Sequence, residues 1–175
     1  WIPNILEVDN IQQADVDWNS KIRIAIACSP EDTRRINKLI KISLDNLKES
    51  IPLEYEFFDE VLYEECLKRR RKFHLSIDNT TQGFMGMWGW ESLAMGQVLL
   101  SRINSITQYQ YETVIGPHMP IVNVDNIDDI CRSIIYFHEN REILRKTAER
   151  SREWMHDHYN PEKIIAKYLQ IYGVK

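Results

Sequence analysis

Two glycines and one glutamate near the middle of the chain have the types and spacing of an anion-binding site. Gly83 and Gly86 lie in a loop after the apolar run 73–78, and Glu91 follows Gly86 by five residues. Glycine lets backbone N–H groups approach a phosphate closely, and a helix N-terminus carries unpaired N–H donors and a partial positive charge. We expect a short helix over 90–95 with Glu91 in its first turn, where a carboxylate can accept hydrogen bonds from sugar hydroxyls. This order of strand, glycine loop and helix predicts a phosphate site beside a sugar-binding carboxylate.

The same residues also permit a purely structural interpretation. Glycines at such spacings make ordinary turns, and Gly96 stands where a helix C-cap is expected. Trp88 and Trp90 would then be core residues. The neighbouring elements decide between these two interpretations, because they determine where the loop lies in the fold.

The neighbouring sequence predicts strands that alternate with helices. Apolar runs of strand length suit parallel strands covered on both faces, and one run that alternates apolar and acidic residues suits a strand nearer the sheet edge. Alternating strands and helices predict an α/β fold, a Rossmann-like doubly wound parallel sheet of about five or six strands with C-terminal helices. In such sheets, ligands lie beyond the carboxyl ends of the strands. The expected strands are 22–28, 53–58, 72–78, 98–101 and 120–124, and the expected helices are 31–47, 60–70, 90–95 and a series from 126 onward.

Length and composition fit one α/β domain with attached segments. The chain has 175 residues, of which 43% are hydrophobic, enough for one core but not for two large domains. We expect 1–20 to be an interdomain linker or entry segment, 21–140 to be the Rossmann-like domain, and 141–175 to be helices that complete it. Because the chain starts with Trp1 and not with methionine, we expect it to be a piece of a longer protein.

Net charge and cysteine content indicate which partners and which cellular compartment are expected. The formal net charge of −4 gives no reason to expect a nucleic-acid partner, and the basic run 68–72 is interpreted as the solvated end of a helix. Cys28, Cys66 and Cys131 are widely spaced, which indicates neither a disulfide framework nor a zinc site and favours the reducing cytoplasm. No apolar run approaches the about 18 residues that a bilayer span needs.

Metal ligation is not indicated either. The chain has no Asp-x-Asp motif, and Asp125, Asp128 and Asp129 are interpreted as capping residues at the start of a helix. His156 and His158 are two residues apart, a spacing that does not place both imidazoles on one helical face. We therefore expect no metal and no separate cofactor.

Three sequence features occur in order along the chain. They are a Pro-Asn pair at 3–4, a Gly-x-x-Gly-x-x-x-x-Glu-x-x-Ala-x-Gly stretch that begins at Gly83, and a helical end that closes on 168–172. Together they resemble the C-terminal, nucleotide-sugar-binding half of a GT-B glycosyltransferase of the family 4 type (glycosyl transferases group 1). The resemblance covers nearly the whole chain and is most specific between Gly83 and Leu100.

The resemblance implies roles for the glycine loop and the glutamate. Glu91 would hold the ribose hydroxyls of a sugar nucleotide. The family commonly has a second glutamate eight positions earlier that contacts the donor sugar, and Gly83 stands there in this chain. The backbone that would face the diphosphate and the donor sugar belongs to Gly83, Phe84, Met85 and Gly86.

The resemblance also implies cations after the first strand. The family places an arginine and a lysine there to neutralise the diphosphate. Arg34, Arg35 or Lys38 could supply that charge here, and Arg35 is our first choice, although exposed cations on an ordinary helix are the alternative.

The implied function is that of a donor-binding half. The parent enzyme would move a sugar from a nucleoside diphosphate sugar to a glycan, lipid or other acceptor, with retention of configuration. The acceptor and the catalytic groups would lie largely on an N-terminal domain outside this chain, so the catalytic residues stay unknown and the chain alone would be inactive. Peripheral association with the inner face of the membrane would come only through the parent protein. Two alternatives remain, a noncatalytic nucleotide- or protein-binding α/β module and a nucleotide-sugar epimerase of the same architecture.

Overall fold

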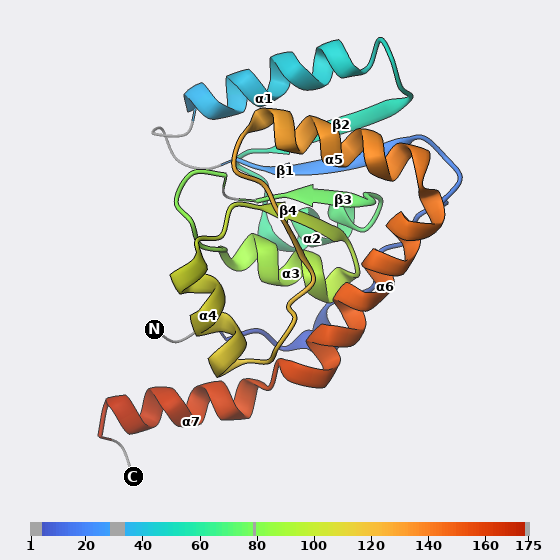
Figure 1. The fold of residues 1–175 in the computed structure, drawn as a ribbon. Coiled ribbons are helices and arrows are strands. Elements are labelled where there is room, and N and C mark those ends of the chain that lie inside the picture. The colour runs from blue at the N-terminus through green and yellow to red at the C-terminus, as the bar shows by residue number, and fades with distance from the viewer. Residues whose placement is uncertain (1–4, 29–33, 79, 174–175) are drawn as a thin grey trace.

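A computed structural model places five parallel strands in one sheet with helices on both faces (Figure 1). It describes residues 5–28, 34–78 and 80–173. The strands are β1 (Ile22–Ala27), β2 (Leu53–Phe58), β3 (Leu75–Ile77), β4 (Val98–Ser101) and β5 (Ile121–Asn123). The helices are a short 3-10 helix η1 (Val8–Asn10), α1 (Arg34–Leu47), α2 (Tyr63–Arg70), α3 (Met87–Met95), α4 (Ser105–Val114), α5 (Ile127–Glu139), α6 (Arg141–His158) and α7 (Pro161–Ile171).

The strand order is β2-β1-β3-β4-β5, which confirms the predicted Rossmann-like sheet. β3 and β4 are buried along their whole length, as their apolar sequences predicted. β2 lies at the edge, as its alternating pattern indicated. β3 is shorter than predicted and covers only Leu75–Ile77. Its register places Leu75 between Ile24 of β1 and Val98 of β4.

Two hydrophobic clusters hold helices on the two faces of the sheet. α1 and α5 cover one face, where Leu44 and Ile134 are fully buried against the strands (Figure 1). α3 covers the other face, and its Leu93 packs in a cluster with Met155 of α6. The helix after β1 and the helix after β3 therefore lie on opposite faces. This makes the carboxyl edge between β1 and β3 the topological switch point, where doubly wound folds bind ligands.

The segment expected to be a linker packs on the domain. Leu6, Val8 and Ile11 are buried in the cluster that contains α3 and α6. The backbone N–H of Ala14 donates to the carbonyl of Met95 at the end of α3 (2.7 Å). The entry segment is thus held against the face of the sheet that carries the glycine loop's helix.

No helix in the described part of the chain combines the length and the apolar character that a bilayer span requires.

His74 joins the entry segment to the sheet. Its side chain is fully buried, and its Nδ1 accepts from the backbone N–H of Arg23 (3.1 Å) while its Nε2 bonds the carbonyl of Asp17 (3.0 Å). These partners require the neutral tautomer with the proton on Nε2. Burial lowers the pKa of His74, and the nearby charges of Arg141 and Arg23 lower it further.

This buried histidine predicts a loss of stability in acid. In the unfolded chain His74 takes up a proton near pH 6.5, whereas the folded chain resists this protonation. The contribution of His74 to the free energy of unfolding is therefore fully present above that pH and is lost as the pH falls below it. Through this group, the free energy of unfolding should fall by at most about 1.4 kcal/mol for each pH unit. Urea unfolding between pH 5 and pH 8 should show that His74→Gln flattens this decline. The exposed His118 provides the control, and an equal flattening by His118→Asn would contradict the assignment.

Candidate functional site

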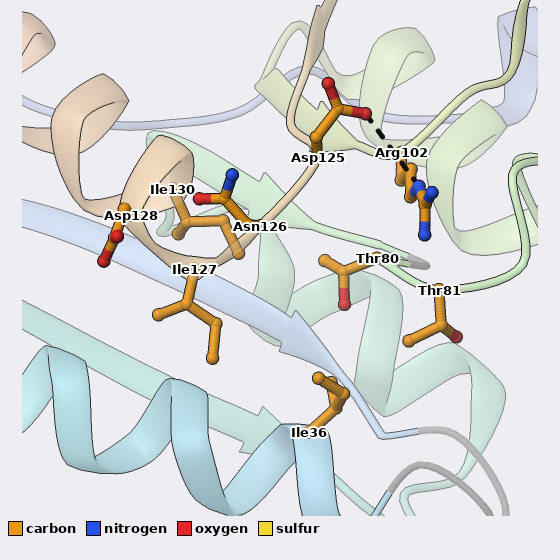
Figure 2. Close-up of a pocket in the computed structure, with 9 residues that line it drawn as sticks. All are labelled: Ile36, Thr80, Thr81, Arg102, Asp125, Asn126, Ile127, Asp128 and Ile130. Carbon is orange, nitrogen blue, oxygen red and sulfur yellow. Dashed lines mark ion pairs between the residues drawn. The ribbon is translucent and has the colours of Figure 1, made fainter.

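An open pocket of about 420 Å³ lies at the carboxyl edge of the sheet (Figure 2). Its apolar wall comes from Ile36 near the start of α1 and from Ile127 and Ile130 at the start of α5. Thr80 and Thr81, in the loop after β3, line the opposite side. The pocket therefore lies at the switch point, and Thr80 and Thr81 of its lining shortly precede the glycine loop in the sequence.

Charged and amide groups complete this pocket. Arg102, just after β4, lies 3.9 Å from the carboxylate of Asp125, so the pair is a loose surface contact. Asn126 caps α5 by accepting from the N–H of Asp129 (3.0 Å), so the side-chain cap is Asn126 and not one of the three predicted aspartates. Of these, Asp129 accepts from the N–H of Asp125 (3.0 Å) just before the helix. Carboxylate, amide, guanidinium and hydroxyl groups around an apolar wall suit a ligand that carries hydroxyls.

The glycine loop ends at the N-terminus of α3, with Gly86 as the N-cap. Within the loop, Met85 is buried in the core, whereas Phe84 is 45% exposed. Gly83 has a φ of +77°, a conformation that favours glycine. A Cβ at this position would lie 2.7 Å from the side-chain nitrogen of Asn104. In this conformation a glutamate at position 83 would strain the backbone and crowd Asn104.

Two N–H groups of the loop already have partners inside the protein. Met85 N–H donates to the hydroxyl of Tyr111 (2.9 Å), and Gly86 N–H donates to the carboxylate of Asp78 (2.9 Å). The next N–H groups, those of Met87 and Trp88, are in the first turn of α3 and have no acceptor within the helix. Asp78 was not among the residues that the sequence analysis selected, although its place directly after β3 is a signal for the ligand edge.

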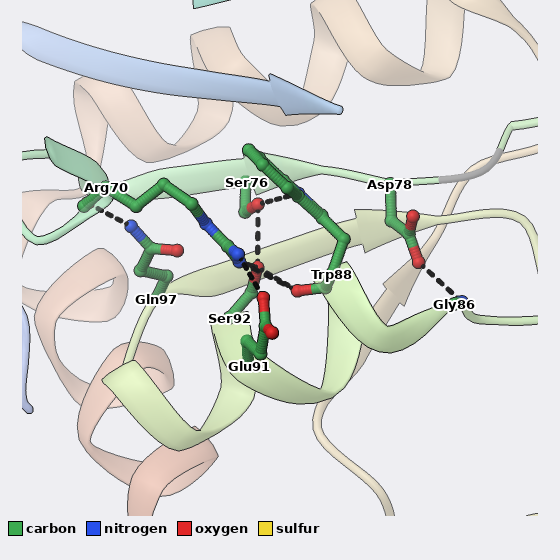
Figure 3. Close-up of polar contacts among 8 residues, drawn as sticks. All are labelled: Arg70, Ser76, Asp78, Gly86, Trp88, Glu91, Ser92 and Gln97. Atoms are coloured by element: carbon green, nitrogen blue, oxygen red, sulfur yellow. Dashed lines mark hydrogen bonds and ion pairs between the residues drawn. The ribbon is translucent and has the colours of Figure 1, made fainter. Parts of the chain in front are cut away.

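Glu91 lies one turn deeper in α3 than the sequence predicted. The helix begins at Met87 and not at residue 90, so the expectation that Glu91 is in the first turn is wrong. Its side chain is only 4% exposed, and one carboxylate oxygen pairs with the guanidinium of Arg70 (Figure 3). The carboxylate is therefore held inside the protein and is not freely offered at the surface.

Arg70 contradicts the expectation that the basic run 68–72 is solvated. It is fully buried at the end of α2 and donates to Ser92 Oγ (2.6 Å) and to the carbonyl of Trp88 (2.8 Å). Its guanidinium carbon also lies 3.6 Å from the centre of the Trp88 ring. A sequence signal existed, because Arg70 continues the helical spacing of Cys66 and Leu67 and so falls on the inward stripe of α2.

The two tryptophans differ in their surroundings. Trp90 is a core residue, as the structural interpretation held, and it contacts the rings of Tyr111 (5.2 Å) and Tyr159 (5.4 Å). Trp88 is half-buried, and its indole N–H donates to Ser76 Oγ (2.6 Å). Gly96 is the left-handed C-cap of α3, as expected, with a φ of 72°. The loop's helix thus combines core packing with a buried polar network.

The predicted cations lie at the start of α1. The helix begins at Arg34, but the side chains of Arg34 and Arg35 are outside the described part of the structure. Lys38 is exposed, one turn into the helix. The helix start follows β1, so these residues belong to the same edge as the pocket.

Among the residues that the structure describes, no group of three or more His, Cys, Asp or Glu side chains lies close enough together to hold a metal ion. His156 lies 3.4 Å from Asp9, whereas the ring of His158 contacts that of Trp154 at 5.3 Å. The two imidazoles therefore have separate partners.

Fold and site together define a Rossmann-like α/β domain with an open pocket at its switch point. Its fold is similar to the folds of glycosyltransferase structures. The C-terminal domain of a glycosyl transferase group 1 family protein (LpcC) from Francisella tularensis matches 89% of this chain over 98% of its own length, with a TM-score of 0.59 and 10% identity. This match confirms the fold that the sequence resemblance implied.

Two structures of TarM match over 98% of this chain. One has a TM-score of 0.66 and 15% identity. The other, a mutant S. aureus TarM in complex with Fondaparinux, alpha-GlcNAc-glycerol and UDP, has a TM-score of 0.68 and 16% identity. This chain spans 38% of the length of each TarM chain. Comparisons with protein-family models and with curated protein sequences gave no match.

Proposed function

We propose that this chain is the donor-binding half of a glycosyltransferase that moves a sugar from a nucleoside diphosphate sugar to a glycan, lipid or other acceptor, with retention. The observation that carries the proposal is the junction of the glycine loop with α3 at the switch point, at the sheet edge where an open pocket also lies. A helix N-terminus at that point favours an anionic ligand. The fold that the chain shares with LpcC and TarM supports the same assignment.

The proposal gives each part of the site a role. The first-turn N–H groups of α3 bind the diphosphate, and Lys38, with Arg34 and Arg35, neutralises its charge. Glu91 binds the ribose hydroxyls. We assign the transferred sugar to the pocket, whose apolar wall and hydroxyl-binding groups suit it.

The remaining parts of the reaction belong to the parent protein. An N-terminal domain supplies the acceptor site and the catalytic groups, so the isolated chain binds the donor without turning it over. We place the parent enzyme in the cytoplasm, in line with three cysteines that form no disulfide.

Two contacts favour a noncatalytic module as the second candidate. The Asp78 carboxylate occupies Gly86 N–H, where a phosphate oxygen would be expected, and Arg70 already pairs with Glu91. A ligand has to compete with both contacts. A module that binds a protein partner would need neither group free.

Titration of the chain with UDP, GDP and their sugars tests the donor-binding role. We expect saturable binding of at least one nucleotide, weakened about tenfold by Glu91→Gln, since a hydrogen bond to a charged group contributes about 1.5–3 kcal/mol. The exposed Glu139 provides a matched control, and Glu139→Gln should bind as the parent chain does. Calorimetry measures the affinities. A folded chain that binds none of these nucleotides would favour the noncatalytic module.

A further inference from the structure

We infer that Arg70 is the positioning residue of the donor site: it supplies the counter-charge of the buried Glu91 carboxylate and fixes one of its oxygens, so that the carboxylate is ready for ribose hydroxyls. This inference rests on the proposed function for the ligand, but its electrostatic part concerns the free protein. It assigns a role to a residue that lies on α2, outside the loop and helix that form the rest of the site.

Hydrogen bonds around Arg70 fix the orientation of its guanidinium group. Nη1 pairs with Glu91 Oε2, while Nη2 donates to Ser92 Oγ (2.6 Å) and to the Trp88 carbonyl (2.8 Å). Ser92 Oγ lies 2.8 Å from Ser76 Oγ, which ties the network to β3 (Figure 3). Two acceptors on α3, Ser92 Oγ and the Trp88 carbonyl, orient the guanidinium, and its other nitrogen then fixes the position of the paired Glu91 oxygen.

Burial makes the pair interdependent. Arg70 is 0% exposed and Glu91 is 4% exposed, so neither charge is compensated by water. Within the described residues, Arg70 Nε has no hydrogen-bond partner, which leaves the carboxylate as the counter-charge of the guanidinium. A buried carboxylate without such a partner favours its uncharged form. Arg70 is thus what allows an anionic hydrogen-bond acceptor at this depth.

The other titratable groups that face Glu91 do not replace Arg70. Tyr63 and Cys66, both on α2, face the Glu91 carboxylate. Burial raises the pKa of each, the Glu91 charge raises both further, and Tyr63 also shares a side-chain hydrogen bond with Glu91. Both are uncharged at neutral pH. Tyr63 can donate a hydrogen bond to the carboxylate, but neither residue carries a positive charge that would replace the guanidinium.

A ligand-free experiment tests the electrostatic role. In Arg70→Met, folded Glu91 is expected to keep a proton at neutral pH, whereas the unfolded chain releases it above about pH 4.3. The unfolding equilibrium constant of this variant should therefore rise as pH increases from 5 to 8, by at most about tenfold per pH unit. Urea unfolding of Arg70→Met and of Arg70→Met/Glu91→Gln gives the contribution of Glu91 by difference, because all other groups are shared.

Two further variants make this comparison decisive. Arg70→Lys keeps a positive charge and should restore the pH profile of the parent chain. Arg70→Gln serves the same purpose as Arg70→Met if the latter does not fold. Parallel profiles for the single and the double variant would overturn the inference, since Glu91 would then be ionised without Arg70.

Nucleotide binding separates this inference from the proposed function. With UDP as the probe, or GDP if UDP does not bind, the affinity of Arg70→Met should rise about tenfold or more between pH 6 and pH 8 relative to the parent chain. An unchanged ratio would contradict the positioning role. Absence of nucleotide binding by the parent chain would overturn the proposed donor site, whereas the ligand-free profiles would still report on the Arg70–Glu91 pair.

Discussion

Glu91→Ala is expected to lower the free energy of unfolding by about 3–5 kcal/mol, because it leaves the Arg70 guanidinium buried without a counter-charge. The loss should appear in urea or thermal unfolding of the ligand-free chain. It has a practical consequence for the site. A lower nucleotide affinity in this variant would mix lost contacts with lost structure. Glu91→Gln keeps the shape and an oxygen acceptor but also removes the counter-charge of Arg70, so its unfolding curve has to be measured alongside its nucleotide affinity.

Removing both charges should recover much of this stability. Replacing a buried ion pair by apolar side chains is often neutral, whereas removing one partner is costly. Arg70→Met/Glu91→Leu is therefore expected to be more stable than Glu91→Ala alone. Glu142, which pairs with Arg145 at the surface, provides the control, and Glu142→Ala should have little effect. If Glu91→Ala were as stable as the parent chain, the pair would not be held as described.

Trp90→Ala is the second substitution with a large expected effect. Trp90 is 1% exposed and packs against Tyr111, whose hydroxyl accepts from the N–H of Met85 in the glycine loop. Truncating a buried tryptophan costs about 3–5 kcal/mol, since it leaves a cavity in a close-packed core. The cavity should also loosen the loop, because Tyr111 loses the ring that holds it.

A neighbouring aromatic residue gives the matched control for Trp90. Tyr109 lies on the same helix as Tyr111 but is 71% exposed. Tyr109→Ala is expected to change the free energy of unfolding by less than about 0.5 kcal/mol. Hydrogen exchange of the Met85 amide provides a local measurement, and protection unchanged in Trp90→Ala would contradict the link between the core and the loop.

The sheet was predictable from the sequence because the pattern of apolar and polar residues in each strand reflects how the strand is buried. β1 and β4 are short apolar runs buried between helices on both faces, and β2 alternates because it lies at the edge. α4 was not predicted. Its sequence has no strong apolar stripe, and the one clear signal was Asn104, whose side chain caps the helix by accepting from Thr107 N–H.

The site was less predictable because it depends on where α3 begins and on a contact between distant elements. The predicted helix started at residue 90 because the glycine at position 89 is typical of a loop. In the structure Gly89 is buried and helical, so α3 starts three residues earlier and Glu91 lies in its second turn. Arg70 was misread because a run of five basic residues normally faces solvent. The helical spacing from Cys66 and Leu67 marks Arg70 as inward-facing, but only the structure shows that it pairs with a carboxylate 21 residues later in the chain.

The conformation of Gly83 limits how this domain could be re-engineered. Installing a glutamate there would require a residue with a side chain to adopt a φ of +77° and to displace the Asn104 side chain, which lies 2.7 Å from the position of the new Cβ. Asn104 in turn caps α4, so its removal would weaken that helix. A substitution at position 83 would therefore disturb the glycine loop and the start of α4 together, although the two segments are about 20 residues apart in the sequence.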